Sequence, residues 1–188
     1  DRQARVRARG AAETMAYSMD GLVELDRVWC LRLNRASRFR SLRRLFRTVS
    51  RLGDGVFWYA LMLALLVVYR AGAVPAVLHM IVTGVVCTLL YKWLKQATLR
   101  PRPFQVECDV VCAAAPLDRF SFPSGHTLHA MAFSVVAVAY YPALVVLLLP
   151  FTLMIAASRV VLGLHYPSDV FAGAAIGTLI AGGSLALL

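Results

Sequence analysis

Long apolar runs separated by short polar turns restrict the fold of this sequence more than any other feature. A helix needs about 20 apolar residues to cross the hydrocarbon core of a bilayer. Five apolar runs each predict a spanning helix: Val56–Tyr69, Val74–Leu94, Gly125–Tyr141, Ala143–Val161 and Ser168–Leu188. The first is short for a crossing, but its ends can extend into the flanking turns. Only 16% of the 188 residues are charged and 60% are hydrophobic. This composition is typical of a membrane protein and not of a soluble domain.

The N-terminal quarter has a different character, because 13 of the 20 basic residues are arginines between Arg2 and Arg51. Residues 20–34 and 38–51 each set apolar side chains against charged ones at helical spacing. They predict two amphipathic helices, the first capped by Asp20, that lie in the membrane interface against anionic headgroups. A basic arm also suits nucleic acid, but the arm has no interleaved aromatic residues that would stack on bases, so no nucleic-acid partner is expected.

We therefore expect an all-α, polytopic membrane bundle of about five spanning helices, preceded by two interfacial amphipathic helices. The chain divides into a basic arm (residues 1–52) and a transmembrane domain (residues 53–188), joined at the helix-breaking turn of residues 53–55. Counting the crossings places the loop of residues 95–124, the turn after the fourth helix and the basic arm on one membrane face. Gly173 and Gly177 lie four residues apart in the fifth helix, which permits close helix packing.

Three groups of polar residues stand at the ends of the predicted spanning helices, where ionisable groups are costly and function is the first hypothesis. The first is Lys95 with Arg100 and Arg102, which alone is also an ordinary basic flank. The second is Pro123-Ser124-Gly125-His126, a helix start whose free amides can bind an anion. Alone, it is also a capped helix with an incidental histidine.

The third group is Ser158-Arg159 followed by His165 and Asp169. Arg159 lies near the end of a long apolar helix, where it needs an anionic partner. If the fifth helix begins near Pro167, Asp169 lies in its first turn and can reach the imidazole of His165. A carboxylate on one ring nitrogen fixes the tautomer and makes the other nitrogen more nucleophilic.

Taken together, the three groups resemble the signature of the type 2 phosphatidic acid phosphatase superfamily. That signature reads Lys-x6-Arg-Pro, Pro-Ser-Gly-His and Ser-Arg-x5-His-x3-Asp, and every position has its match in this sequence. The resemblance extends over about residues 50–188. It implies a phosphoric-ester hydrolase of the membrane, whose substrate is a lipid phosphate or pyrophosphate such as phosphatidate, phosphatidylglycerol phosphate or a polyprenyl pyrophosphate.

The resemblance also implies a role for each motif residue. His165 attacks phosphorus and forms a phosphohistidine, Asp169 orients it, and His126 protonates the leaving oxygen. The phosphate oxygens are held by five residues: Lys95, Arg102, Ser124, Gly125 and Arg159. No cofactor and no metal are expected, because three cations replace the metal and no carboxylate cluster for magnesium is evident. Vanadate, which mimics pentacoordinate phosphorus, is expected to inhibit the enzyme.

Other interpretations remain open. The same histidine would serve a lipid-to-lipid phosphotransferase, and a non-catalytic lipid-binding protein can share the fold. The spanning helices argue against a soluble vanadate-dependent haloperoxidase. Three other residues near the motifs have simpler interpretations. Arg100 can contact headgroups, Asp54 is a turn residue, and His129 is a supporting or packing residue.

The side of the membrane is also open, because two arguments conflict. The resemblance to bacterial relatives favours a multi-pass protein of the inner membrane with a periplasmic site. Cys108 and Cys112, in the same loop, would suit that oxidising side if they are bridged, although two free thiols are equally compatible with the sequence. The concentration of basic residues at the active-site face favours the cytoplasm. The sequence leaves the oligomeric state undetermined.

Overall fold

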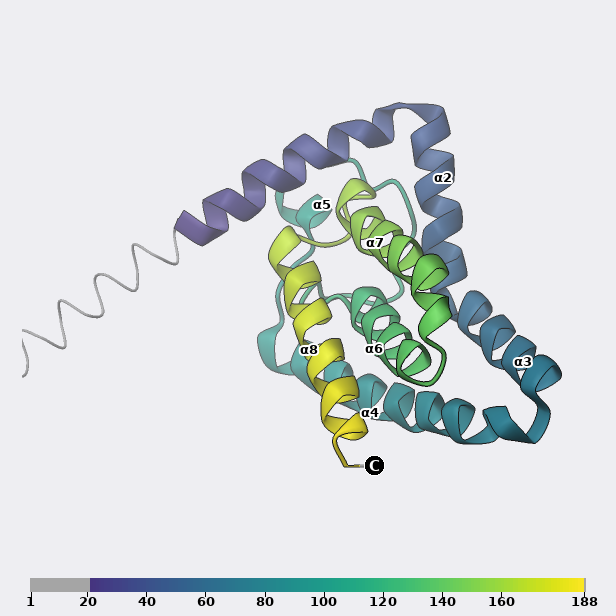
Figure 1. Cartoon of the computed structure of the whole chain (residues 1–188). Helices are drawn as coiled ribbons and strands as arrows, with labels where there is room; N and C mark the ends of the chain where they lie inside the picture. The colour runs from purple at the N-terminus through teal and green to yellow at the C-terminus, as the bar shows by residue number, and fades with distance from the viewer. Residues whose placement is uncertain (1–20, 188) are drawn as a thin grey trace, which may run out of the picture.

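The computed structural model describes residues 21–187, and every regular element within them is a helix (Figure 1). An N-terminal helix (residues 21–34) and a turn, η1 (Arg35–Arg38), lead into α2 (Arg40–Arg51). A wide helical turn, η2 (Leu52–Val56), follows, in which Gly55 has a φ of 135°. This turn confirms the predicted break at residues 53–55. The predicted cap, Asp20, lies outside the described residues.

Five apolar helices follow in the rest of the chain, and their bounds agree with the five predicted runs. They are α3 (Phe57–Tyr69), α4 (Val74–Thr98), α6 (Gly125–Tyr140), α7 (Val145–Val161) and α8 (Pro167–Leu185). α4 continues past the predicted end at Leu94, so Lys95 lies within the helix and not in the loop. Three continuous helical stretches are long and apolar enough to cross a membrane: Arg40–Val106, Pro142–Val161 and Pro167–Leu185.

The first of these stretches contains both α3 and α4, which the turn η3 (Arg70–Ala73) joins. The chain is thus an all-helical membrane protein, while the count of five crossings stays a prediction. α6 has 16 residues, which is short for a crossing.

α6 is the central helix of the bundle and packs against α4, α7 and α8 (Figure 1). Its contact with α8 is unusually close at two glycines, as the spacing of Gly173 and Gly177 predicted. A Cβ atom on Gly173 would lie 2.6 Å from the carbonyl oxygen of Ser124, and one on Gly177 would lie 2.3 Å from that of Leu128. Only glycine permits backbones to approach so closely. The first turns of α6 and α8 are therefore held side by side.

The connecting segments gather at two ends of the bundle as predicted. At one end, the rings of Tyr69 and Tyr141 lie 4.6 Å apart. At the other end, the amide of Ala113 donates to the carbonyl oxygen of Leu162 over 3.0 Å. The side chain of Asn34 joins the N-terminal helix to the same region by donating to the carbonyl oxygens of Val111 and Val161.

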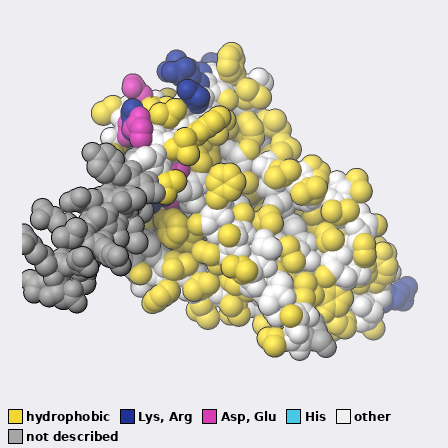
Figure 2. Space-filling model, turned by 60° about the vertical axis from the view of Figure 1, so that its left-hand side comes forward, with side chains coloured by type: hydrophobic (Ala, Val, Ile, Leu, Met, Phe, Trp, Pro, Cys, Tyr) yellow, Lys and Arg dark blue, Asp and Glu magenta, His cyan; other side chains and the backbone are white. Residues whose placement is uncertain are grey.

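The apolar stripe of the N-terminal helix faces outward, away from the protein. Leu22, Leu25 and Trp29 are 58%, 54% and 45% exposed, whereas Asp26 and Cys30 are buried. Figure 2 shows hydrophobic side chains over most of one face of the molecule, with charged side chains gathered near one end. An outward apolar stripe beside charged residues is the pattern of a helix in a membrane interface. The interfacial position itself stays a prediction, as does the division of the chain at residue 52.

Candidate active site

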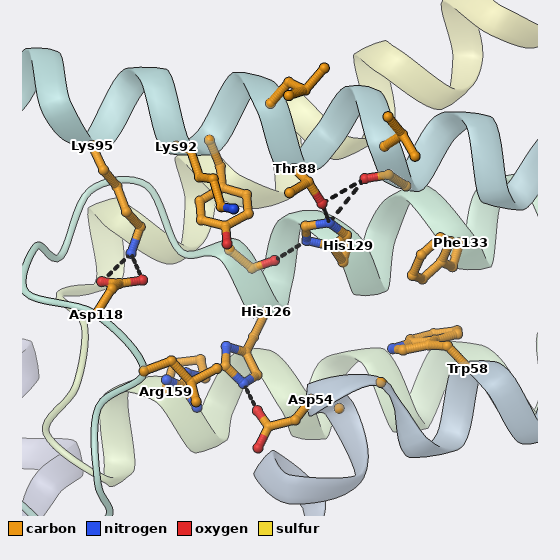
Figure 3. A pocket seen from close by; sticks show the side chains of 18 of the residues that line it. Asp54, Trp58, Thr88, Lys92, Lys95, Asp118, His126, His129, Phe133 and Arg159 are labelled. Carbon is orange, nitrogen blue, oxygen red and sulfur yellow. Dashed lines mark hydrogen bonds and ion pairs between the residues drawn. The ribbon is translucent and has the colours of Figure 1, made fainter.

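One cavity of about 820 Å³ collects most of the predicted site residues (Figure 3). Six of the eight line its wall: Lys95, Arg102, Gly125, His126, Arg159 and His165. They come from the ends of α4, α6 and α7, from the start of α5 (Pro103–Val106) and from the turn before α8. The other two, Ser124 and Asp169, are fully buried behind the wall. Helix ends far apart in the sequence thus converge on one space.

The opposite part of the cavity is apolar. Its wall includes Met62 from α3, Phe133 from α6, and Ile81, Val85 and Leu89 from α4. These three residues of α4 are also 47%, 54% and 66% exposed on the outer surface of the molecule. The cavity therefore joins a cationic end to an apolar end that reaches the outside of the bundle. Such a shape suits an amphiphile with an anionic head.

Two predicted phosphate-binding cations share one carboxylate. The ammonium group of Lys95 donates to both oxygens of Asp118, over 2.7 and 2.8 Å, and to the carbonyl oxygen of Phe120 over 3.0 Å. The guanidinium group of Arg102 donates to the same carboxylate over 2.8 Å. These two cations hold the pKa of Asp118 below its ordinary value, although burial of the carboxyl group acts in the opposite direction. Asp118 had no role in the sequence-based prediction.

Arg159 is the third predicted cation, and it is only 2% exposed. Its Nη1 donates to the hydroxyl of Ser50 on α2. Its Nε has no hydrogen-bond partner within the described part of the chain. No carboxylate of residues 21–187 lies within ion-pair distance of it. A buried guanidinium without a paired anion is costly, and this one borders the cavity. The geometry fits an oxyanion held in the cavity.

His126 lies in the first turn of α6 and pairs with a carboxylate that sequence reasoning set aside. Its Nε2 contacts the Oδ1 of Asp54, the residue between the two glycines of the turn η2 (Figure 3). Both residues line the cavity. Asp54 is therefore placed at the site and is more than a turn residue. The carboxylate of Asp54 can orient the imidazole of His126 for proton transfer at the cavity.

His165 is 1% exposed and lies between the cations and Asp169. Its Nε2 is 3.4 Å from Nη1 of Arg102 and its Nδ1 is 3.7 Å from Oδ2 of Asp169. Burial, together with the nearby cations Arg159, Arg102 and Lys95, holds the pKa of His165 well below its ordinary value. The imidazole is therefore neutral near pH 7, which is the state that a nucleophile requires.

Asp169 lies beside His165 as predicted, but its hydrogen bonds go elsewhere. Oδ2 accepts from the amide of Tyr166 over 2.8 Å, and Oδ1 accepts from the guanidinium of Arg100 over 2.6 Å. The 3.7 Å to His165 Nδ1 exceeds a hydrogen bond, and Nδ1 has no partner among the described residues. Sequence reasoning assigned Arg100 no role beyond a headgroup contact, and in the structure it pairs with Asp169.

Ser124 and Gly125, the other two predicted phosphate-binding residues, lie at different positions relative to the cavity. The hydroxyl of Ser124 hydrogen-bonds to that of Thr127 over 3.0 Å and does not reach the cavity wall. Gly125 does line the cavity, but a Cβ there would only touch the ring of Tyr91 at 3.5 Å. His129, behind Gly125, bonds to its carbonyl oxygen over 2.8 Å and to Thr88 over 3.0 Å, in agreement with a supporting role.

The fold and the cavity together define a class of protein: a helical membrane protein with two histidines and three cations at the head of an amphiphile-shaped cavity. Cations at these positions can hold the equatorial oxygens of a phosphoryl group, and a neutral histidine among them can attack it. Across residues 21–187, no group of three or more His, Cys, Asp and Glu side chains is arranged to hold a metal ion.

The sequence comparison agrees with this class. A model of the PAP2 superfamily matches residues 72–188, which is more than half of the chain. The chain therefore belongs to the PAP2 superfamily, and the family predicted from the three motifs is confirmed.

Two curated relatives are similar to this chain in sequence. The chain is 34% identical over 103 residues to the lipid A 1-phosphatase of Rhizobium johnstonii, covering 53% of this chain and 42% of that protein. The corresponding protein of Rhizobium etli is 33% identical over 103 residues, with coverage of 53% and 44%. The chain thus spans less than half the length of these curated relatives.

Two crystal structures share the fold. The PAP2-type phosphatidylglycerolphosphate phosphatase of Bacillus subtilis superimposes with a TM-score of 0.73 at 25% identity, covering 89% of this chain and 86% of that one. LpxE of Aquifex aeolicus superimposes with a TM-score of 0.68 at 28% identity, covering 87% of this chain and 94% of that one. Both alignments extend well beyond the matched superfamily segment.

Proposed function

We propose that this protein is a lipid phosphatase that cleaves a phosphomonoester or pyrophosphate through a phosphohistidine on His165. The observation that carries the proposal is the position of His165 Nε2. It faces Arg102 at 3.4 Å in a cavity that Lys95 and Arg159 also line. The apolar arm of the same cavity supports a lipid as the substrate.

In the first step, the lone pair of His165 Nε2 attacks phosphorus in line, and the bond from phosphorus to the lipid oxygen breaks. His126, paired with Asp54, gives its proton to the leaving oxygen, so the lipid departs as an alcohol or, from a pyrophosphate, as a monophosphate. Lys95, Arg102 and Arg159 neutralise the charge on the transferred group. The positive charge that develops on His165 is stabilised by Asp169.

In the second step, His126 accepts a proton from a water molecule, whose oxygen attacks phosphorus as the bond to Nε2 breaks. The products are inorganic phosphate and neutral His165. Substrate binding requires Lys95 and Arg102, which now hold Asp118. The substrate phosphate therefore takes the place of this carboxylate or shares the cations with it.

A phosphate-release assay tests the proposal. Purified full-length protein would be given phosphatidate, phosphatidylglycerol phosphate, a polyprenyl pyrophosphate and lipid A, the last because the curated relatives are named for it. We expect release from at least one lipid, activity that persists in EDTA, inhibition by vanadate, and a loss of at least about 10⁴-fold in His165→Ala. Equal turnover by wild type and His165→Ala would contradict the proposed nucleophile, and a requirement for magnesium would contradict metal independence.

We further propose that the active site faces the periplasm, on the analogy with bacterial relatives. Cys108 and Cys112 are free and exposed, so they can report the orientation. Labelling of Cys108 by a membrane-impermeant thiol reagent in intact spheroplasts, under reducing conditions, is the expected result. Protection until the membrane is opened would place the site in the cytoplasm, as the basic arm suggests.

A further inference from the structure

A partly buried chain of ion pairs connects the N-terminal helix to the carboxylate beside His165. Arg100 lies in the centre of this chain. Its Nη1 donates to Asp169 over 2.6 Å and its Nη2 donates to Asp26 over 2.8 Å. Asp26 is 8% exposed and Asp169 is completely buried. The guanidinium carbon of Arg100 also lies 4.4 Å from the centre of the Tyr166 ring, which holds the planar group against an aromatic face.

Asp26 also contacts Ser168, which precedes Asp169 in the sequence. Its Oδ1 accepts from the amide of Ser168 over 2.9 Å, and its Oδ2 contacts the hydroxyl of Ser168. Ser168 lies in the first turn of α8, where amide groups lack partners within the helix. A carboxylate on such an amide caps the helix and complements its dipole. Asp26 therefore caps, from another helix, the turn that carries Asp169.

Charge within this chain has a consequence for the histidine. Two carboxylates share one guanidinium, so the group carries a net charge of about −1 when all three are ionised. This charge lies beside His165, which becomes positive when it bonds to phosphorus. Hydrogen bonds in active sites are often long before substrate binds, and they tighten in the reacting complex. The 3.7 Å between His165 Nδ1 and Asp169 Oδ2 leaves room for such a movement.

We propose that Arg100 and Asp26 are positioning residues for the nucleophile, and that the N-terminal helix is part of the catalytic machinery. Arg100 orients the carboxylate of Asp169, and Asp26 fixes both Arg100 and the start of α8. Asp26 lies outside residues 72–188, the segment that the superfamily model matches. The proposal rests on the proposed function and assigns to it a part of the chain that lies outside the segment matched by the superfamily model.

The experiment compares Arg100→Gln, Arg100→Ala and Asp26→Asn in the full-length protein, with the lipid that wild type hydrolyses best. Asp109→Asn and Arg32→Gln are matched controls, because both side chains are exposed. Groups that orient a metal-binding histidine cost about 10- to 100-fold when removed, and we expect a similar loss of kcat here with KM nearly unchanged. The expected losses are larger for the Arg100 variants than for Asp26→Asn.

Two further measurements separate positioning from simple instability. Guanidinium at millimolar concentration should restore several-fold activity to Arg100→Ala and none to Asp26→Asn, since a misfolded protein is not rescued by a small cation. The double variant Asp26→Asn/Arg100→Gln should be no slower than Arg100→Gln alone, because both residues act through Asp169. Losses that multiply, an unrescued Arg100→Ala, or a kcat within twofold of the controls would each overturn the proposal.

A measurement of vanadate binding distinguishes failure of this proposal from failure of the proposed function. Trp58 lines the cavity, so its fluorescence can report vanadate binding without turnover. Absence of phosphate release by wild type from every lipid would refute the proposed function alone. Vanadate should then still bind wild type at least about tenfold more tightly than Arg100→Ala, since bonding to His165 requires an oriented imidazole. Equal affinity would overturn the role of Arg100.

Discussion

The two carboxylates on either side of His165 make the same kind of ion pair in very different surroundings. Asp169 is completely buried, and it is fixed by Arg100 and by the amide of Tyr166. Asp118 lies in a loop without regular structure, its side chain is 37% exposed, and it borders the cavity. Burial of Asp169 holds the first pair in place, because moving Arg100 away would leave this carboxylate unpaired in a low dielectric. Partial exposure makes the second pair exchangeable, since water or a phosphate can replace the carboxylate.

The comparison shows that the same kind of ion pair, between a carboxylate and a cation, can have two different roles within one site. In the proposed mechanism, Asp169 supplies a permanent charge to the nucleophile. Asp118 would keep Lys95 and Arg102 paired until a stronger anion arrives, and would so compete with the substrate. Substitution of Asp169 should therefore lower turnover, whereas substitution of Asp118 should strengthen binding.

The largest effect is expected from Asp169→Asn. The amide keeps the shape of the carboxylate but removes the charge that stabilises His165 as it becomes positive. We expect kcat to fall by about 10⁴-fold, as for loss of the orienting carboxylate in other histidine-containing triads, with KM nearly unchanged. Asp109→Asn, an exposed carboxylate, is the control in the same phosphate-release assay. A loss smaller than tenfold would show that Asp169 is not the orienting group.

A smaller effect of the opposite sign is expected from Asp118→Asn. Removing a competing, partly exposed ion pair is worth about 1 kcal/mol, or roughly fivefold in affinity. We expect KM and the inhibition constant of vanadate to fall by that factor, with kcat within a factor of about two. Because Lys95 loses its partner, the melting temperature without ligand should also fall, and phosphate should restore it. A raised KM would mean that Asp118 holds the cations in place for the substrate.

The smallest effect concerns pH. The pKa of His165 lies well below its ordinary value, because of burial and the cations Arg159, Arg102 and Lys95. The nucleophile therefore stays neutral as pH falls through its ordinary value of about 6.5, and kcat/KM should decline only at lower pH. Lys95→Gln removes one cation and should move this acid limb upward by less than about one pH unit. Lys92→Gln, on the same cavity wall, should not move it.

Much of the fold and the centre of the site could be predicted from the sequence. The five apolar helices have nearly their predicted bounds, because hydropathy alone determines where such runs begin and end. Lys95, Arg102, His126, Arg159 and His165 were expected together, and they line one cavity. Their spacing relative to helix ends was enough, since the helix ends that carry them lie at the same end of the bundle.

The sequence did not reveal the roles of the carboxylates Asp26 and Asp118 or of the cation Arg100. Their contacts depend on the path that the chain takes between and beyond the helices. Leu99 ends α4 in a left-handed conformation with a φ of 50°, and the turn that follows directs Arg100 inward to Asp169. Asp118 meets Lys95 across 23 residues of chain, most of them in an irregular loop that has no periodicity to interpret. Asp26 was assigned to the polar face of an amphipathic helix. In the structure Asp26 is buried, whereas Glu24 of the same polar face stays exposed, Arg27 stays partly exposed and the apolar stripe turns outward.

The exposed apolar residues of α4 that line the cavity have a consequence for how this protein would meet its substrate. Ile81, Val85 and Leu89 belong to the cavity wall and to the outer surface of the helix at once. A lipid can then reach the histidine by diffusing sideways in the plane of the bilayer. Its encounter rate depends on its mole fraction among the surrounding lipids and not on its amount per volume of water. Inert lipid added at constant total substrate thus acts as a diluent, and membrane composition itself becomes a control on the rate.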